Sequence, residues 1–80
     1  MIFTDGVHLI TDSNDPEELH QFAQMIGIKR DYYQNKRKGH PHYDILSKTV
    51  RERAIRCGAK QATAKELVRI IKAKGDHASG

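Results

Sequence analysis

The chain has 80 residues, a formal net charge of +4 at pH 7 and one cysteine. A chain of this length forms a single domain with a thin core, and its lone cysteine excludes an internal disulfide framework and fits a reducing cytoplasm. The sequence has neither the basic start and apolar run of a signal peptide nor an apolar stretch near the roughly 20 residues of a membrane span, so we expect a cytoplasmic protein with no membrane partner.

The basic residues are confined to one part of the chain. Residues 1–28 contain five acidic residues and no Lys or Arg, whereas all fourteen Lys and Arg residues lie between Lys29 and Lys74. Residues 29–80 therefore hold fourteen basic against five acidic side chains, a net charge of +9. This polarity is typical of domains that bind phosphate or nucleic acid, and equally of a solvated basic surface.

The first third of the chain is predicted to contain two short strands and a helix. Residues 1–4 and 7–11 are β-prone and are separated by an Asp-Gly turn, which favours a hairpin or one deeply paired strand beside an edge strand. Asp15 and Glu18 fit a capping box with a proline between them, so we expect a helix over 16–26.

The rest of the chain is predicted to contain a polar loop and two further helices. Residues 28–34 and 60–62 are short candidate strands, and composition makes 35–41 a loop. Apolar residues at helical spacing predict helices over 47–57 and 64–74. We expect one shared core, which contains Leu19, Phe22, Ile26, Val50, Ala54, Leu67 and Ile71.

Strands that alternate with helices predict the fold class, a small single-domain α/β protein whose short, partly parallel sheet packs against about three helices. The domain is expected to span residues 1–74, with 75–80 as a flexible C-terminal tail. In sheets of this kind ligands bind beyond the carboxyl ends of the strands. That rule predicts Asp12, the basic loop and the helix N-termini at one edge of the sheet.

Several short motifs occur in order between Val7 and Ile71. They are His8-Leu9-Ile10-Thr11-Asp12, Glu18-Leu19-His20-Gln21-Phe22-Ala23, Ile26-Gly27, Tyr33-Gln34, His42-Tyr43-Asp44 and Gly58-Ala59. In order and spacing they resemble the bacterial and phage family catalogued as domain of unknown function 4031, and the likeness covers most of the chain. The resemblance implies a fold and a recurring polar set rather than a reaction. The chain departs from longer members in its short N-terminus and in the inserted Lys36-Arg37-Lys38.

The resemblance implies a polar set of site residues, which are His8, Asp12, His20, Tyr33, Gln34, His42, Tyr43 and Asp44. We predict that His8, His20 and His42 converge in one pocket beside Asp12 or Asp44. The simpler interpretation of each residue alone differs. His20 would then be a helix-edge histidine bonded to a backbone carbonyl, and His8 a strand residue facing solvent.

Histidines and carboxylates in this number suit metal binding, but the spacing matches no compact metal signature. We therefore predict no metal ligands and no cofactor. His42 and Asp44 are two residues apart and face the same side of an extended segment, where a carboxylate orients a general base. No catalytic residue is assigned on this pattern, and Cys57 is expected in the core rather than as a nucleophile.

The segment 34–44 is the strongest candidate for a binding site, because it contains the consecutive basic residues Lys36, Arg37 and Lys38. Arginine grips phosphate with two hydrogen bonds, and one of the three tyrosines is expected to stack on a base. We predict a non-enzymatic domain that binds a nucleotide or nucleic acid. The alternatives are a histidine-dependent phosphoester hydrolase, with or without a metal, and a phage or bacterial accessory protein with a protein partner. A homodimer also fits so thin a core.

Overall fold

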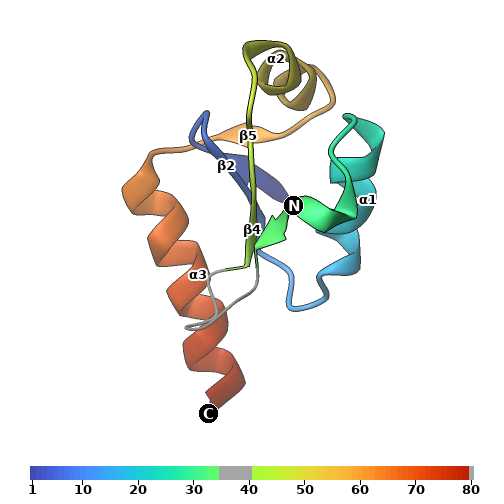
Figure 1. Ribbon diagram of the computed structural model, residues 1–80. Helices are drawn as coiled ribbons and strands as arrows, with labels where there is room; N and C mark the ends of the chain where they lie inside the picture. The colour runs from blue at the N-terminus through green and yellow to red at the C-terminus, as the bar shows by residue number, and fades with distance from the viewer. Residues whose placement is uncertain (35–40, 80) are drawn as a thin grey trace.

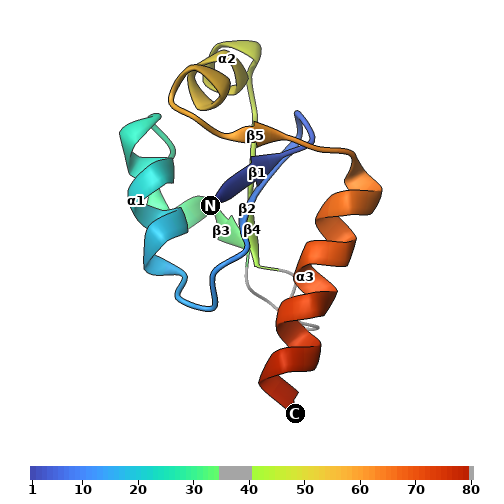
Figure 2. The ribbon, with the colours of Figure 1, turned by 180° about the vertical axis from the view of Figure 1, so that it is seen from behind.

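The computed structural model describes residues 1–34 and 41–79, which form a small α/β domain built on a mixed sheet (Figures 1 and 2). In chain order the elements are β1 (Ile2–Thr4), β2 (His8–Thr11), α1 (Glu17–Met25), the 3-10 helix η1 (Arg30–Tyr32), β3 (Tyr33–Gln34), β4 (His42–Asp44), α2 (Lys48–Arg56), β5 (Lys60–Gln61) and α3 (Ala64–Ser79). The strands found in these ranges follow the order β3-β4-β2-β1-β5, in which β1 and β5 run parallel and the other pairs antiparallel. The predicted fold class is confirmed.

The hairpin of β1 and β2 is the centre of the sheet. Ile2 lies opposite Thr11 and Thr4 opposite Leu9, so the two strands are antiparallel. Gly6 in the connecting turn has a φ of 97°, a backbone conformation that glycine adopts at little cost. β4 pairs with the outer side of β2, and β5 with the outer side of β1.

Helices cover both faces of the sheet. α1 lies on one face and α3 on the other, and α2 lies at one end of the sheet (Figures 1 and 2). α1 and α2 share a buried cluster with the sheet, against which Val50 packs. The cluster contains Ile2, Leu9, Leu19, Phe22, Ala23, Ile26, Ile28, Tyr43, Ile45, Ala54 and Ala59.

The prediction of one shared core is wrong for α3. Leu67 is buried and Ile71 is partly buried, but neither belongs to the cluster around Leu19 and Phe22. Both instead face Ile10 across a cleft on the opposite side of the sheet. Apolar spacing identifies the buried side of a helix but not which face of a sheet it covers, so the sequence pattern merged two cores into one.

Local hydrogen bonds begin α2 and α3 where the sequence predicts. The Ser47 hydroxyl oxygen accepts a hydrogen bond from the Val50 amide at 3.1 Å. Thr63 and Glu66 form a reciprocal capping box, with distances of 2.8 and 3.1 Å. Each cap satisfies amides that have no partner within the helix. α3 then continues to Ser79, so its predicted end at residue 74 is wrong.

The capping box predicted for α1 is also wrong. Asp15 accepts from the amide of Glu17 at 3.0 Å rather than from Glu18. The Glu18 carboxylate turns toward the sheet, where it accepts a hydrogen bond from the Thr11 hydroxyl. A tertiary partner has therefore replaced the local one.

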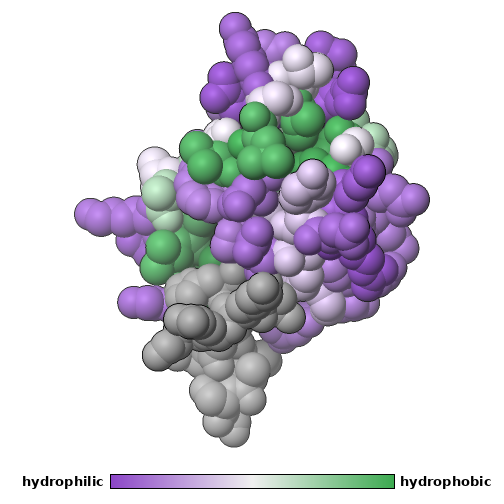
Figure 3. All heavy atoms as spheres, in the orientation of Figure 1, coloured by the Kyte–Doolittle hydropathy of each residue, from purple (hydrophilic) through white to green (hydrophobic). Residues whose placement is uncertain are grey.

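Part of the apolar surface is exposed. Figure 3 shows hydrophobic surface below α2 amid a largely hydrophilic exterior. The exposed large apolar residues include Val7 and Leu46, which lie close together because the Ile45 amide donates to the Val7 carbonyl at 2.7 Å. Cys57 is exposed as well, so its predicted place in the core is wrong.

Candidate functional site

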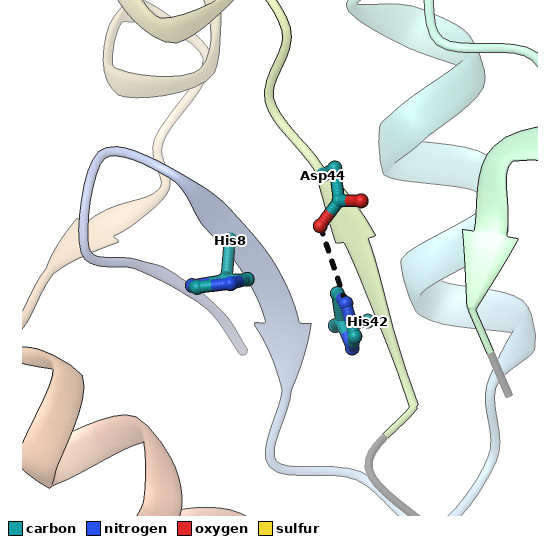
Figure 4. A group of neighbouring side chains, drawn as sticks. All are labelled: His8, His42 and Asp44. Carbon is teal, nitrogen blue, oxygen red and sulfur yellow. Dashed lines mark ion pairs between the residues drawn. The ribbon is translucent and has the colours of Figure 1, made fainter. Parts of the chain in front are cut away.

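Strand pairing brings His8, His42 and Asp44 together. His8 in β2 lies directly opposite Asp44 in β4, and Leu9 lies opposite Tyr43. Because side chains alternate along a strand, His42 shares the face of Asp44 and His8. Figure 4 shows His8 on β2 and the ion pair of His42 with Asp44 on β4. The His8 and His42 rings meet edge to face with their centroids 5.2 Å apart.

β3 adds one more polar residue to this face. Gln34 pairs with His42 across β3 and β4, so it points to the same side of the sheet and is exposed. We call the side chains of His8, Gln34, His42 and Asp44 the histidine face. It looks toward α3, and thus away from the main hydrophobic cluster.

His42 and Asp44 form the pair that their spacing predicts. His42 Nε2 lies 3.2 Å from Asp44 Oδ1, and the side chains are 23% and 39% exposed. This exposure leaves the pair reachable from solvent while part of each side chain is held by its neighbours. A carboxylate in this position fixes the orientation of the imidazole ring. A fixed ring is what proton transfer or ligand binding by a histidine requires.

Asp5 holds the second histidine, and it is absent from the polar set predicted from the sequence. Asp5 Oδ2 lies 3.1 Å from His8 Nδ1, and Asp5 Oδ1 accepts the amides of Val7 and His8 at 2.9 and 2.7 Å. Burial raises the pKa of the Asp5 carboxyl, but the hydrogen bonds from His8 and Val7 outweigh it and hold the pKa below its usual value of 3.8. The Asp-Gly turn three residues before a strand histidine was the available signal.

A cleft runs between the histidine face and α3. Its volume is about 170 Å³, and it is walled by the apolar residues Ala64, Leu67, Val68 and Ile71 of α3. Asp5, His8, Ile10 and His42 line the opposite wall. The cleft therefore places two imidazoles beside an apolar surface, a setting in which polar interactions are strengthened by reduced contact with water.

The prediction that three histidines converge is wrong, because His20 lies on the other face of the sheet. Its Nδ1 atom is 2.6 Å from the Tyr43 hydroxyl, and its ring contacts Tyr33 at a centroid distance of 4.5 Å. Burial raises the pKa of both tyrosines. His20 is buried in the core rather than at a helix edge, and its hydrogen-bond partner is a tyrosine hydroxyl rather than the backbone carbonyl of the simpler interpretation.

The tyrosines of the polar set lie in the hydrophobic core or pack against it. Tyr43 is completely buried, and Tyr33 lies opposite it in β3 with its ring 5.3 Å away. Among the three tyrosines only Tyr32 is exposed. If a base stacks on a tyrosine in this fold, Tyr32 is the one that offers a ring face without unpacking the core.

Asp12 lies at the far end of β2 from His8. Its Oδ1 accepts a hydrogen bond from the Met1 amine at 2.9 Å. The start of α1 and Pro41 lie beside Thr11 at this edge, whereas α2 and α3 begin at the other end of β2 and β4. The predicted gathering of helix N-termini is therefore wrong for α2 and α3, since the rule holds for parallel strands and most pairs here are antiparallel.

The basic residues Lys36, Arg37 and Lys38 lie outside the described residues. In the described ranges, α2 and α3 carry further exposed basic side chains, and some have structural roles. Arg53 Nη1 donates to the Ile26 carbonyl at 3.3 Å, at the end of α1. Arg51 lies over the β1–β2 turn, where its Cδ is 3.5 Å from the position of a Cβ on Gly6.

Among the described residues, no helix has the length and apolar character that a membrane crossing requires.

Comparison with known proteins gives a family and no closer relative. Searches of curated proteins and of solved structures found no match to the chain. A family model does match, over residues 5–74, which include the strands β2 to β5, both α1 and α2, and most of α3. The chain therefore belongs to the family described as "Protein of unknown function (DUF4031)".

Proposed function

We propose that this domain binds a phosphate-bearing ligand, a nucleotide or a nucleic-acid strand, at the histidine face. The contact between the His8 and His42 rings carries the proposal, because it presents two partly exposed imidazoles whose centroids are 5.2 Å apart. Imidazole N–H groups donate hydrogen bonds to phosphate oxygens. Lys36 to Lys38 belong to the same connection between β3 and β4 that ends at His42, so the sequence joins positive charge to the histidines.

The charges of the histidine face are compatible with an anionic ligand. Asp44 faces His42, and Asp5 faces His8. Each carboxylate thus has an imidazole partner among the described residues and does not stand alone against a phosphate. The single cysteine supports a reducing cytoplasm as the compartment where binding takes place.

The proposal is tested by replacing Lys36, Arg37 and Lys38 together with alanine. We expect weaker binding of single-stranded DNA, RNA or nucleotides, with an unchanged circular dichroism spectrum. For a nucleic-acid strand the slope of log affinity against log salt should fall by up to about two units, since each of three phosphate contacts contributes about 0.7. For a small nucleotide the slope should be shallower, and His42→Ala should weaken binding as much as the triple change.

A matched control exists on α3, where Lys65, Arg69 and Lys72 are exposed. Alanine at these three positions removes the same charge but leaves the β3–β4 connection intact. The proposal predicts that this control binds nearly as well as wild type. Equal losses in the two triple variants would mean that only net charge matters, and would remove the argument for a site at the histidine face.

A second candidate is a phosphoester hydrolase, favoured by the His42–Asp44 pair. A histidine oriented by a carboxylate at 3.2 Å has the geometry of a general base. In that case His42→Ala abolishes turnover while the ligand still binds, because a general base acts mainly in the transition state. Product formation from a model phosphodiester, measured for wild type and His42→Ala, separates this candidate from simple binding.

A third candidate is a protein partner or a second copy of the chain, supported by the exposed apolar pair Val7 and Leu46. Exposed apolar patches mark interaction sites when they are contiguous. Sedimentation velocity of wild type and Leu46→Lys distinguishes a second copy of the chain from a different protein partner. A homodimer held by this patch becomes monomeric in the variant. A monomer in both cases, with no ligand bound and no product formed, leaves a heterologous protein partner.

A further inference from the structure

We propose that His8, His42 and Asp44 bind one divalent transition-metal ion. Each of the three residues offers a ligand atom, and these atoms lie within 4.8 Å of one another. The residues come from two neighbouring strands, β2 and β4, whose pairing fixes their separation. The proposed function does not require a metal, so this inference goes beyond it.

The separations suit a metal ion with little rearrangement. Metal–nitrogen and metal–oxygen bonds of about 2.0–2.2 Å place two ligands of a tetrahedral ion about 3.3 Å apart. His42 Nε2 and Asp44 Oδ1 are 3.2 Å apart already. The remaining ligand atom, from His8, lies within 4.8 Å of the other two and must approach by up to about 1.5 Å, and the His8 side chain is 43% exposed and has room to turn.

Asp5 is the positioning residue of this site. It faces His8 Nδ1 at 3.1 Å and is itself held by the Val7 and His8 amides. When Nδ1 carries the proton that this contact needs, Nε2 has the free lone pair and becomes the metal ligand. A carboxylate behind a ligating histidine is the usual outer partner in zinc sites, where it fixes the tautomer and the ring orientation.

The donor set indicates which ions bind. Two imidazole nitrogens and one carboxylate oxygen suit zinc, iron, cobalt or nickel, whereas magnesium and calcium prefer all-oxygen sites. Three protein ligands leave at least one position on the ion for water or a phosphate oxygen. The suggestion that a phosphate oxygen takes this position rests on the proposed function, while binding of the metal alone does not.

The experiment uses the full chain after treatment with a chelator and its removal. Titration with ZnCl₂, followed by calorimetry, should show one ion per chain. His8→Gln and His42→Gln should each weaken zinc binding by more than about 100-fold, because losing an outer partner alone costs 10- to 100-fold. Asp5→Asn should fall within that smaller range and should not remove binding. Circular dichroism in the presence of chelator checks that every variant is folded.

Two control variants separate the site from other metal-binding groups. His77→Ala removes a histidine near the end of α3, and Asp31→Asn an exposed carboxylate of η1, and neither should change zinc affinity. A measurement on wild type needs no variant: Co²⁺ should give hyperfine-shifted proton signals from two of the five histidines, assigned to His8 and His42.

The outcomes decide between the inferences. Absence of zinc binding, equal zinc affinity in wild type and both histidine variants, or cobalt-shifted signals from other histidines would overturn the metal site. Wild-type affinity in Asp5→Asn would overturn the positioning role. Zinc binding that is lost in His8→Gln, in a protein that binds no nucleotide, nucleic acid or inorganic phosphate, would support the metal site and reject the proposed function.

Discussion

His20 of α1 and Tyr43 of β4 are joined by a 2.6 Å hydrogen bond between Nδ1 and the hydroxyl group, inside the hydrophobic core. Tyr43 is completely buried and His20 is buried. This contact is a polar link between the first helix and the strand that carries the histidine face on its other side. The contact matters for stability because removal of either partner leaves the other buried without a hydrogen bond. A buried polar group without a hydrogen bond destabilises the fold by its full desolvation free energy.

We predict that Tyr43→Phe lowers the free energy of unfolding by about 1–3 kcal/mol, because it leaves the buried His20 nitrogen without its hydroxyl partner. Urea denaturation followed by circular dichroism measures the change. Tyr32→Phe is the matched control, since Tyr32 is exposed and its hydroxyl loss should cost less than about 0.5 kcal/mol. Equal effects of the two substitutions would mean that the buried contact contributes no net stability.

The two faces of the sheet should behave as energetically separate cores. Ile26 is buried on the α1 face and Ile10 on the α3 face, and Ile→Val at each should cost about 0.5–1.5 kcal/mol. The double variant should be additive within about 0.5 kcal/mol, as for residues without shared partners. Ile2→Val combined with Ile26→Val, both in one cluster, is the comparison pair. A larger coupling between Ile10 and Ile26 than within that pair would contradict the two-core arrangement.

Glu18 should contribute to acid sensitivity. The Thr11 hydroxyl and the Met1 amine hydrogen-bond its carboxylate and lower its pKa below the usual 4.5. Because the pKa is lower when folded, the contribution is present above pH 4.5 and is lost as the pH falls through the folded-state pKa. We expect Glu18→Gln to flatten this part of the curve of urea midpoint against pH. Glu52→Gln, an exposed change on α2, is the control; an acid limb that is the same in Glu18→Gln and wild type would reject this assignment.

Two glycines should respond differently to alanine. Gly58 has a φ of 108° and an open neighbourhood, so Gly58→Ala should cost about 1–2 kcal/mol of conformational energy alone. A Cβ on Gly27, at φ 93°, would lie 3.1 Å from Arg53 Nη1, which bonds the Ile26 carbonyl. Gly27→Ala should therefore cost about 1 kcal/mol more, the usual net value of a hydrogen bond.

The glycine prediction has an internal check in Arg53→Ala. With the arginine absent, Gly27→Ala has no side chain to displace, and its cost should drop to that of Gly58→Ala. Thermal or urea denaturation of the four variants supplies the comparison. If Gly27→Ala still lowers the free energy of unfolding more than Gly58→Ala when Arg53 is alanine, the extra loss comes from the backbone conformation and not from the arginine.

The helices were predictable because their signals are local. Ser47 and Thr63 cap helices from within the same few residues, and apolar spacing within each helix marks its buried side. The end of α3 was not predictable, since the apolar pattern stops before the helix does. The face of the sheet that α3 covers was not predictable either, because it depends on the path of the chain after β5.

The candidate site was predictable only within one strand. The contact of His42 with Asp44 follows from the two-residue repeat of extended chain. The place of His8 beside them depends on the β2–β4 register, and that register is set by packing between distant segments. His20 instead lies on α1, whose packing against the other face of the sheet brings it to Tyr43. Asp5 was not predicted as a site residue because an aspartate before a glycine indicates only a turn. Its contact with His8 depends on how that turn folds back.

The alternation of His42, Tyr43 and Asp44 along β4 makes this strand intolerant of a change in length. Insertion or deletion of a single residue here would exchange the two sides, exposing a tyrosine hydroxyl and ring while turning a histidine and a carboxylate into the apolar interior. A two-residue change would restore the inside-to-outside order at the expense of the pairing with β2. Variation in length should therefore be accepted in the connection before Pro41 and rejected within the triplet, and a library of insertions selected for folded protein would reveal that boundary.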